Sequence, residues 1–262
     1  MKIMSYNILE GGNLSKGDRT DLLIDIIRTA GPDILGLNEC RGFADDDEAR
    51  LRLFERELGM TGVLNRSASG NHIAILFRPD LPVVERSGKS VSMQNGYTRI
   101  TLQTEIGSVA VVATHLHPFA SVFRVGEMQI VAARAAAADA AIVMGDMNSV
   151  APGDAEGLEL AGAPRTMTTR LRGPGGGIDT DAISVLLNHG YTDLGAKAAT
   201  PTYPTPVSRE KADPIVRLDY MFASAPVAER FRGLEVIGGE SGLTASDHLP
   251  IVAEIDLPVA GR

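Results

Sequence analysis

The residues of this chain that could do chemistry are acids, amides and imidazoles placed at the ends of apolar runs. Most follow a run that is typical of a buried strand, as residues 109–113 precede the third motif. Because a packed sheet fixes the geometry of its strand ends, polar side chains delivered to one rim are typical of an active site. The six motifs are Met4-Ser5-Tyr6-Asn7, Leu37-Asn38-Glu39, Thr114-His115-Leu116, Gly145-Asp146-Met147-Asn148, Arg217-Leu218-Asp219-Tyr220 and Ser246-Asp247-His248-Leu249-Pro250.

Oxygen ligands dominate this polar set. Carboxylate and amide oxygens that converge without cysteine favour Mg²⁺ or Mn²⁺ over zinc. Glu39 would be costly to desolvate alone, and a bound cation relieves that cost; for an isolated case, a solvated strand-end glutamate is the simpler alternative. The hard oxygen donors are Asn7, Glu39, Asp146, Asn148, Asp219 and Asp247.

Two histidines extend the set to proton transfer. His248 follows Asp247, and a second carboxylate, for which Asp219 is the candidate, could orient its imidazole. His115 ends an apolar run, where it could donate a proton to a phosphoryl oxygen. The alternatives are a turn capped by Asp247 with His248 packed on Pro250, and a purely structural His115.

Asp146 and Asn148 stand two apart after a glycine. Gly145 permits a tight turn, and strand alternation puts both polar side chains on one face. An acid and an amide so placed can hold and activate a water. Taken alone, the same pattern is also that of an ordinary turn.

The remaining polar residues have weaker signals. Arg99 is a candidate phosphate contact, because a guanidinium suits phosphate, although a surface cation at a strand start is an equal alternative. Arg124 and Glu127 fall at helical spacing and are expected to pair with each other. His72 and His117 are expected to be structural.

The composition is that of a globular protein with an acidic balance. The 262 residues are 44% apolar and 22% charged, which fits one large domain over residues 1–262. Lys and Arg total 25 against 33 Asp and Glu, a formal charge of −8. Since nucleic acids are normally met by a basic face, this balance weakens a nucleic-acid function, although a bound divalent cation can invert the local field.

Three absences favour a cytoplasmic location. No apolar run is long enough to cross a bilayer, and the N-terminus passes straight into a predicted strand without a signal-peptide segment. Cys40 is the only cysteine, so no internal disulfide can form and a reducing compartment fits.

Apolar periodicity predicts a mixed α/β sandwich. We expect hairpins between 72–78 and 83–87 and between 98–105 and 108–114, together with strand–helix–strand units. The expected strands are 2–8, 33–38, 60–65, 72–78, 83–87, 98–105, 108–114, 141–145, 217–223, 232–238 and 250–256, and the expected helices are 19–30, 46–58, 121–139 and 181–189. Two long loops, 151–180 and 196–216, are expected to wall the substrate pocket.

In this order along the chain, the six motifs resemble those of the endonuclease/exonuclease/phosphatase superfamily. This DNase I-like group includes apurinic endonucleases, neutral sphingomyelinases and inositol polyphosphate 5-phosphatases. The match runs from Asn7 to Pro250, and six motifs in order are far more specific than one. The resemblance implies an α/β (α+β) fold, a four-layer αββα sandwich of two mixed β-sheets flanked by helices, with the site at one end of both sheets.

The resemblance also implies roles for the polar residues. Glu39 would be the principal Mg²⁺ (or Mn²⁺) ligand, with Asn7 and Asp247 close to the metal. Asp146 and Asn148 would position the attacking water and the phosphoryl group.

For the histidines, the resemblance implies roles in proton transfer and in stabilising negative charge. His248, paired with Asp219, would act on the phosphate or as the acid–base group, and His115 would stabilise developing negative charge. The division of labour between Asp146 and the Asp219–His248 dyad stays open. The candidate substrate contacts are Arg99, Asn148 and His115.

Three departures speak against abasic-DNA repair. Apurinic endonucleases usually carry a polar or acidic residue where this chain has Leu9, Gln where it has Asn38, and Lys where it has Arg41. The chain has no Trp and is only 5% aromatic, which leaves few platforms for stacking bases.

We therefore expect a divalent-metal-dependent phosphoester hydrolase, a phosphatase or phosphodiesterase in which an activated water attacks in line. A small phosphorylated metabolite, nucleotide or lipid head group is favoured as substrate over nucleic acid. The alternatives are a DNase-like or apurinic-type endonuclease/exonuclease, a non-catalytic binding module, and an iron site built from His115, His248 and a carboxylate. The sequence indicates no protein partner.

Overall fold

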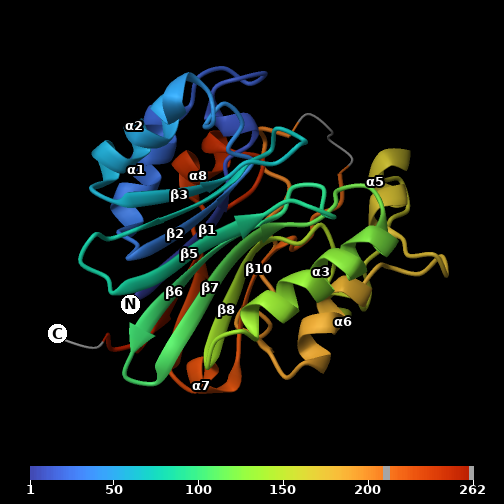
Figure 1. Ribbon diagram of the computed structural model, residues 1–262. Coiled ribbons are helices and arrows are strands. Elements are labelled where there is room, and N and C mark those ends of the chain that lie inside the picture. The colour runs from blue at the N-terminus through green and yellow to red at the C-terminus, as the bar shows by residue number, and fades with distance from the viewer. Residues whose placement is uncertain (209–212, 260–262) are drawn as a thin grey trace.

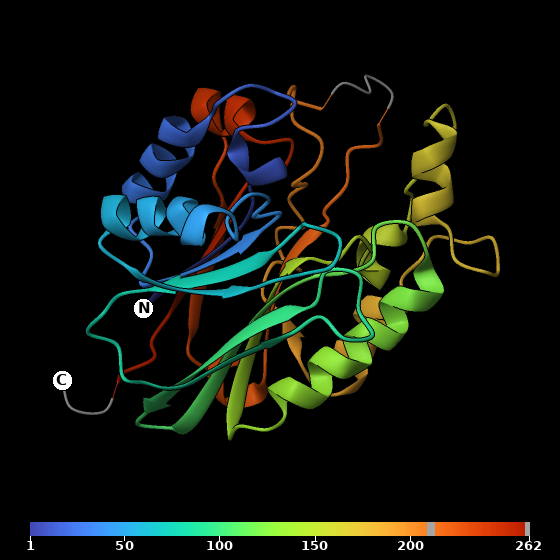
Figure 2. The ribbon, with the colours of Figure 1, turned by 45° about the horizontal axis from the view of Figure 1, so that its top comes forward.

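Two six-stranded sheets pack face to face and are covered by helices on their outer sides (Figures 1 and 2). The computed structural model describes residues 1–208 and 213–259. The strand orders are β11-β12-β1-β2-β4-β3 in the first sheet and β5-β6-β7-β8-β10-β9 in the second. The predicted four-layer αββα sandwich of mixed sheets is confirmed.

The first sheet combines the N-terminal strands with the last two strands. β1 runs parallel to β2, and the other pairings in this sheet are antiparallel. Its outer face packs on α1, whose buried residues Leu23 and Ile27 form an apolar stripe. The helix ends at Gly31, which adopts the left-handed conformation (φ 60°). Its strands are β1 (Lys2–Asn7), β2 (Ile34–Asn38), β3 (Thr61–Asn65), β4 (Ile73–Phe77), β11 (Phe231–Val236) and β12 (Ile251–Ile255), and its helices are α1 (Thr20–Ala30), α2 (Ala49–Leu58) and α8 (Gly239–Ala245).

The second sheet is built from the middle of the chain. β7 and β8 are its parallel pair, and α3 crosses its outer face with α6 beside it (Figure 1). Its strands are β5 (Val83–Lys89), β6 (Tyr97–Thr104), β7 (Gly107–His115), β8 (Ala140–Asp146), β9 (Thr192–Asp193) and β10 (Asp219–Ala223). The other helices are α3 (Ser121–Ala135), α4 (Pro152–Ala155), α5 (Arg165–Leu171), α6 (Asp181–Asn188) and α7 (Ala225–Ala228). The buried Val227 of α7 packs in the core between the sheets. Two 3₁₀ segments, η1 (Glu10–Gly12) and η2 (Asp46–Glu48), belong to the first half of the chain.

The main core lies between the two sheets. Alternation along each strand sends Ile3 and Ile142 into this core, while Met4 and Val143 face the helices. Strands buried on both faces read as unbroken apolar runs, which is why these segments are visible in the sequence. A rigid double sheet of this kind holds its strand ends in fixed positions.

One of the two predicted hairpins is wrong. β6 and β7 pair as expected, but β4 lies in the first sheet between β2 and β3, whereas β5 is an edge strand of the second sheet paired with β6. All five residues of β4 are buried, whereas most of β5 is exposed. The segment 78–82 therefore carries the chain from one sheet to the other instead of closing a hairpin.

Several short elements lie outside the predicted ones. The loop predicted at 151–180 contains α4 and α5, and β9, α7 and α8 had no counterpart in the sequence analysis. α5 is held by a small apolar cluster in which Met167 and Leu171 meet Tyr203 and Val216. Such short pieces depend on packing and not on their own periodicity.

Within residues 1–208 and 213–259, no helix has the length and apolar character that crossing a membrane requires.

Candidate active site

The register of the two sheets gathers the polar motifs at one rim. In the second sheet, Asp146 at the end of β8 pairs with His115 on parallel β7 and with Asp219 on antiparallel β10. In the first sheet, β1 and β2 place Asn7 beside Asn38 at their carboxyl ends. β1 also packs against β8 and β10, so the two strand-end groups meet.

Asp146 is the centre of the site. Its Oδ2 atom accepts a hydrogen bond from Asn7 Nδ2 at 3.1 Å. The same oxygen lies 3.4 Å from His115 Nε2 and 3.7 Å from His248 Nε2. Burial acts to raise the pKa of this carboxyl, but the two imidazoles and the N–H of Asn148 outweigh it, so the pKa of Asp146 lies below its usual range. Asp146 is therefore an ionised carboxylate in a nearly solvent-free position.

His248 and Asp219 form a buried pair beside Asp146. His248 Nδ1 lies 2.7 Å from Asp219 Oδ2. Burial acts to lower the pKa of His248, but the charges of Asp219 and Asp146 outweigh it and raise that pKa to about 10. The ring of Tyr203 packs on the imidazole, with 4.9 Å between the ring centroids. The imidazole is thus held through Nδ1 and presents Nε2 to the site.

Asn148 is fixed at both atoms of its amide. Its backbone adopts the left-handed conformation (φ 49°), and its N–H donates to Asp146 Oδ1 at 2.9 Å. Nδ2 donates to the carbonyl of Leu116 at 3.0 Å, and Oδ1 accepts a hydrogen bond from Nη2 of Arg170. Sequence analysis gave Arg170 no role, and its only signal was a cation inside one of the two long segments that bracket the motifs.

Glu39 and Asp247 are the carboxylates available to a cation. Glu39 is half-buried, its backbone is left-handed (φ 60°), and its Oε1 lies 3.3 Å from Asn7 Nδ2. Burial raises the pKa of Asp247 to about 6; His248 opposes this shift, whereas the charges of Glu39 and Asp146 add to it. A bound cation would stabilise the ionised form of Asp247, which its neighbouring carboxylates disfavour.

This donor set fits a hard divalent cation held by few protein ligands. In the described part of the chain, no three His, Cys, Asp or Glu side chains cluster so as to hold a metal ion by themselves. Mg²⁺ is usually bound through one or two carboxylates and keeps several waters, which matches Glu39, Asp247 and the amide of Asn7. An iron site of two histidines and one carboxylate needs three such ligands together, and residues 1–208 and 213–259 contain no such group.

Asn38 joins the two sheets beneath the site, and Gly145 lies beside this link. Asn38 is fully buried; its Nδ2 donates to the carbonyl of Thr114 (3.0 Å) and its Oδ1 accepts the N–H of Asp146 (3.0 Å). Gly145 has a φ of 140°, and a Cβ there would lie 1.8 Å from the oxygen of Thr114. The predicted tight turn at Gly145 is thus a close approach of strands, which only glycine permits.

Arg99 lies apart from this group. It is buried on β6, and its Nη1 is 2.6 Å from Oε2 of Glu85 on β5. Because Ile100 points into the core between the sheets, Arg99 lies on the opposite face. The geometry gives it a structural ion pair, so the proposed site does not include it.

Arg124 and Glu127 do not pair with each other, contrary to the prediction. Arg124 is fully buried and binds Asp179 through Nε (2.9 Å) and Nη2 (2.6 Å). Glu127 accepts the N–H groups of Gln94 and His117, each at 2.6 Å. Each residue therefore binds a partner outside α3 in preference to the neighbour at helical spacing. These contacts hold α3 against loops at the site end of the second sheet.

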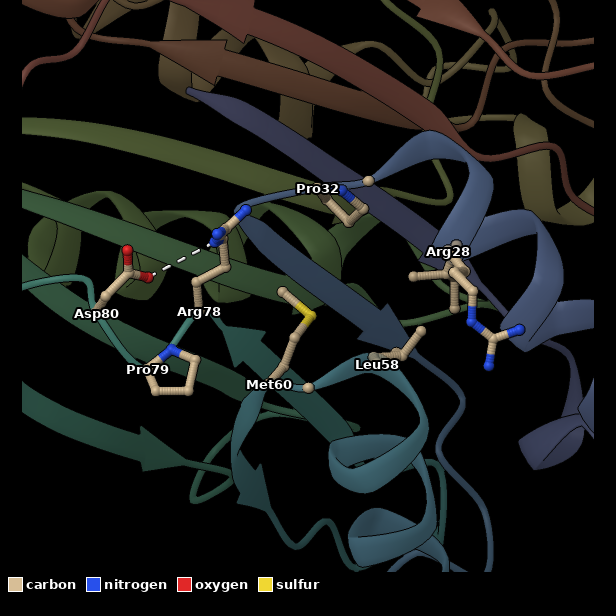
Figure 3. Close-up of a pocket in the computed structure, with 10 residues that line it drawn as sticks. Arg28, Pro32, Leu58, Met60, Arg78, Pro79 and Asp80 are labelled. Atoms are coloured by element: carbon tan, nitrogen blue, oxygen red, sulfur yellow. Dashed lines mark ion pairs between the residues drawn. The ribbon is translucent and has the colours of Figure 1, made fainter.

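A pocket of about 480 Å³ lies at the opposite end of the first sheet (Figure 3). Pro32, before β2, and Arg78, after β4, line it, whereas Glu39 follows the far end of β2. Arg78 faces Asp33 at 3.8 Å and Asp80 at 3.6 Å, so its charge is matched locally. This pocket is separate from the polar rim.

One family model matches nearly the whole chain. The model of the Endonuclease/Exonuclease/phosphatase family matches residues 4–248. A search of curated proteins gives no match. Among solved structures, the chain is similar to a 3′ phosphatase from Neisseria bound to a product DNA hairpin, with a TM-score of 0.72, 17% identity, and coverage of 98% of this chain and 99% of that one.

Two further structures are similar over nearly their whole lengths. An AP endonuclease from Archaeoglobus fulgidus has a TM-score of 0.69 and 20% identity, with 98% of this chain and 99% of that chain covered. A mannosyl-6-phosphatase from Bacteroides thetaiotaomicron has a TM-score of 0.66 and 16% identity, with 97% and 99% covered. At these identities the likeness shows the fold.

Proposed function

The chain belongs to the endonuclease/exonuclease/phosphatase family, and on that premise we propose that it is a divalent-metal-dependent phosphoester hydrolase. Members of this family are phosphoesterases and nucleases, so hydrolysis of a phosphoester is the class of reaction. The observation that carries the proposal is the convergence on Asp146 Oδ2 of an amide at 3.1 Å and two imidazoles at 3.4 and 3.7 Å. Such a group can hold a water and a phosphoryl oxygen side by side.

In the proposed reaction, Asp146 and Asn148 hold the attacking water. Asp146 Oδ1 accepts the N–H of Asn148, whereas Oδ2 accepts the amide of Asn7, faces the imidazoles and would accept the proton of the water. The side chain of Asn148 is locked by Leu116 and Arg170 and would orient the phosphoryl group. Attack in line then needs little movement of either side chain.

The imidazoles supply the hydrogen-bond donors that the transition state needs. Asp219 accepts the Nδ1 proton of His248 and so fixes the ring with Nε2 as the donor to the phosphate or the leaving group. His115 offers a second Nε2, and in the described part of the chain its buried Nδ1 has no hydrogen-bond partner. His115 is the proposed stabiliser of negative charge on the phosphoryl oxygens.

Glu39, Asn7 and Asp247 would hold the metal ion. When bound, Mg²⁺ or Mn²⁺ supplies a Lewis acid that polarises a phosphoryl oxygen and neutralises the leaving group. Glu39 is prepared for this role, since its Oε2 accepts the N–H of Glu10 at 3.1 Å and its other oxygen faces Asn7.

The proposed substrate is a small phosphorylated metabolite, nucleotide or lipid head group. The formal charge of −8 and the small share of aromatic residues support this choice over a polyanion. A DNase-like or apurinic-type nuclease is the second candidate, favoured by the likeness to an AP endonuclease and to a phosphatase bound to DNA. The third, a binding module without catalysis, is disfavoured by the intact set of polar residues. Cytoplasmic location and the lack of an inferred protein partner stay expectations from the sequence.

The test is hydrolysis of four substrates with Mg²⁺: a generic phosphomonoester, a generic phosphodiester, plasmid DNA and an inositol phosphate. We expect turnover that EDTA abolishes and Mg²⁺ or Mn²⁺ restores. Glu39→Gln and His248→Ala should each lower kcat/KM by about 10²–10⁴-fold, the usual range for losing an acid–base or electrostatic group.

Matched controls are Glu240→Gln and His189→Ala, because both side chains are exposed and lie outside the site. Both controls should keep full activity. Turnover that survives EDTA, or that is unchanged in Glu39→Gln and His248→Ala, would contradict the mechanism. DNA cleavage in preference to the small substrates would establish the nuclease instead.

A further inference from the structure

The guanidinium of Arg170 lies at the edge of the proposed site, on a segment that contains none of the six motifs. Arg170 belongs to α5, and one of its nitrogens, Nη2, donates to Asn148 Oδ1 at 2.5 Å. Asn148 in turn donates its backbone N–H to Asp146. Two hydrogen bonds, through Asn148, therefore connect Arg170 to the carboxylate of Asp146 at the centre of the site. Arg170 also contacts the side-chain amide of Asn148, which is proposed to orient the phosphoryl group.

Within the part of the chain that the structure describes, not all N–H donors of the Arg170 guanidinium are used in hydrogen bonds. A guanidinium has five N–H donors. Nε donates to the carbonyl of Pro118 (2.9 Å), Nη2 donates to Asn148, and Nη1 lies 3.5 Å from the sulfur of Met167, which is a weak acceptor. No carboxylate is paired with Arg170 in the described part of the chain. An arginine so placed has a full charge and at least two donors free for an anion.

The backbone around Arg170 is anchored, so the position of its side chain is built into the fold. Fully buried Arg124 donates to the carbonyl of Arg170 at 2.6 Å and binds Asp179 on the far side of the segment. Met167, one turn before Arg170, and Leu171, the next residue, are buried in a small apolar cluster. α5 is therefore fixed to α3 and to the core, and Arg170 points from a fixed helix.

We propose that Arg170 is a substrate-binding residue that contacts the non-bridging phosphate oxygens and favours a terminal phosphomonoester. This inference rests on the proposed hydrolase function and names the class of substrate. It gives Arg170 the phosphate-binding role that the sequence suggested for Arg99, whose guanidinium is committed to Glu85.

The preference for a monoester follows from charge. At neutral pH a phosphomonoester carries close to two negative charges and a diester carries one, and Coulomb energy scales with the product of the charges. A guanidinium therefore attracts the monoester about twice as strongly as the diester at equal distance. Arginine also matches a phosphate with two parallel N–H bonds, which a terminal phosphate, with three free oxygens, accepts more readily than a diester.

The test combines binding with kinetics on purified full-length protein. Inorganic phosphate is titrated by calorimetry into the wild type, Arg170→Ala, Arg170→Lys and the control Arg165→Ala, which removes an exposed arginine of the same helix. KM and kcat are then measured with Mg²⁺ for p-nitrophenyl phosphate and bis(p-nitrophenyl) phosphate. Melting temperatures show whether each variant is folded, and Arg170→Lys keeps the charge if the alanine variant is unstable.

We expect Arg170→Ala to weaken phosphate binding and to raise KM for the monoester by about 10- to 100-fold, the worth of a charge-assisted hydrogen bond. KM for the diester should rise much less, Arg170→Lys should recover part of the loss, and Arg165→Ala should match the wild type. If the wild type hydrolyses the monoester and folded Arg170→Ala is unchanged, the role of Arg170 is refuted and the hydrolase function stands.

The opposite result separates the two proposals as well. If the wild type hydrolyses none of the substrates but binds phosphate through Arg170, the hydrolase function fails and the binding role stands. A wild type that neither binds phosphate nor hydrolyses either ester overturns both. Equal losses for monoester and diester would refute the preference for a terminal phosphate.

Discussion

Replacing Asn38 by alanine should weaken the fold and the site together. The amide of Asn38 donates to the carbonyl of Thr114 and accepts the N–H of Asp146, each at 3.0 Å, and the side chain is fully buried. In Asn38→Ala both backbone groups lose this partner where water does not reach them. Each costs about 1–3 kcal/mol, so the free energy of unfolding should fall by about 2–6 kcal/mol.

For a chain of this length, a loss of about 1 kcal/mol lowers Tm by about 2 °C, so Tm should fall by about 4–12 °C. Thermal unfolding followed by circular dichroism measures this shift. Hydrolysis by the same preparation, assayed well below Tm, should fall by about tenfold or more, because the backbone of Asp146 loses an anchor and small displacements of a reacting group are costly.

Asn188→Ala is the control, because Asn188 is an exposed asparagine at the end of α6 and its loss should change stability by less than about 0.5 kcal/mol. Asn38→Asp is a second arm, since it keeps an acceptor for the N–H of Asp146 but sets an oxygen against the carbonyl of Thr114. If Asn38→Ala melts within about 1 °C of the wild type and keeps its kcat, the proposed link between the sheets is refuted.

Two further outcomes are expected. Gly145→Ala should destabilise the protein by about 3 kcal/mol or more, because its Cβ would lie 1.8 Å from the oxygen of Thr114. The control Gly126→Ala lies in open space on α3 and should be neutral or stabilising in the same melting assay. Equal Tm values for the two variants would contradict this prediction. Burial, helped by nearby arginines, lowers the pKa of His72, whose Nδ1 accepts the N–H of Ser67 at 3.0 Å. As pH falls, His72 therefore takes up a proton in the unfolded chain before it does so in the folded protein, so the free energy of unfolding should decline below pH 6.5. Chemical denaturation measures this decline, which should be smaller in His72→Asn. An unchanged dependence on pH in His72→Asn would refute the prediction.

The sequence predicted the layers and the polar rim because both depend on local patterns. Strands buried on both faces appear as apolar runs, and His115 and Asp146 end two of them, so these two residues could be placed without knowing the pairing. Sheet membership is a different matter. The pattern of residues 72–78 and 83–87 is that of a hairpin, and only the burial of all five residues of β4 shows that it belongs in the interior of the other sheet.

The residues that sequence analysis missed act through distant partners. Asn38 meets groups 76 and 108 positions away, and Arg170 reaches a side chain 22 positions away. No periodicity encodes such contacts, because they exist only once two sheets or a helix and a sheet have docked. The same holds for Arg124 and Glu127, whose helical spacing suggested each other and whose partners lie elsewhere.

The strand order of the first sheet sets when the proposed site is assembled during synthesis. β12, near the end of the chain, lies between β11 and β1, and the turn that carries Asp247 and His248 comes just before it. Until β12 leaves the ribosome, β1 keeps one open edge and Asp146 lacks one of its two imidazoles. A nascent chain that already displays Asn7, Glu39 and Asp146 thus still lacks part of the proposed site, which is complete only when β12 has joined the sheet.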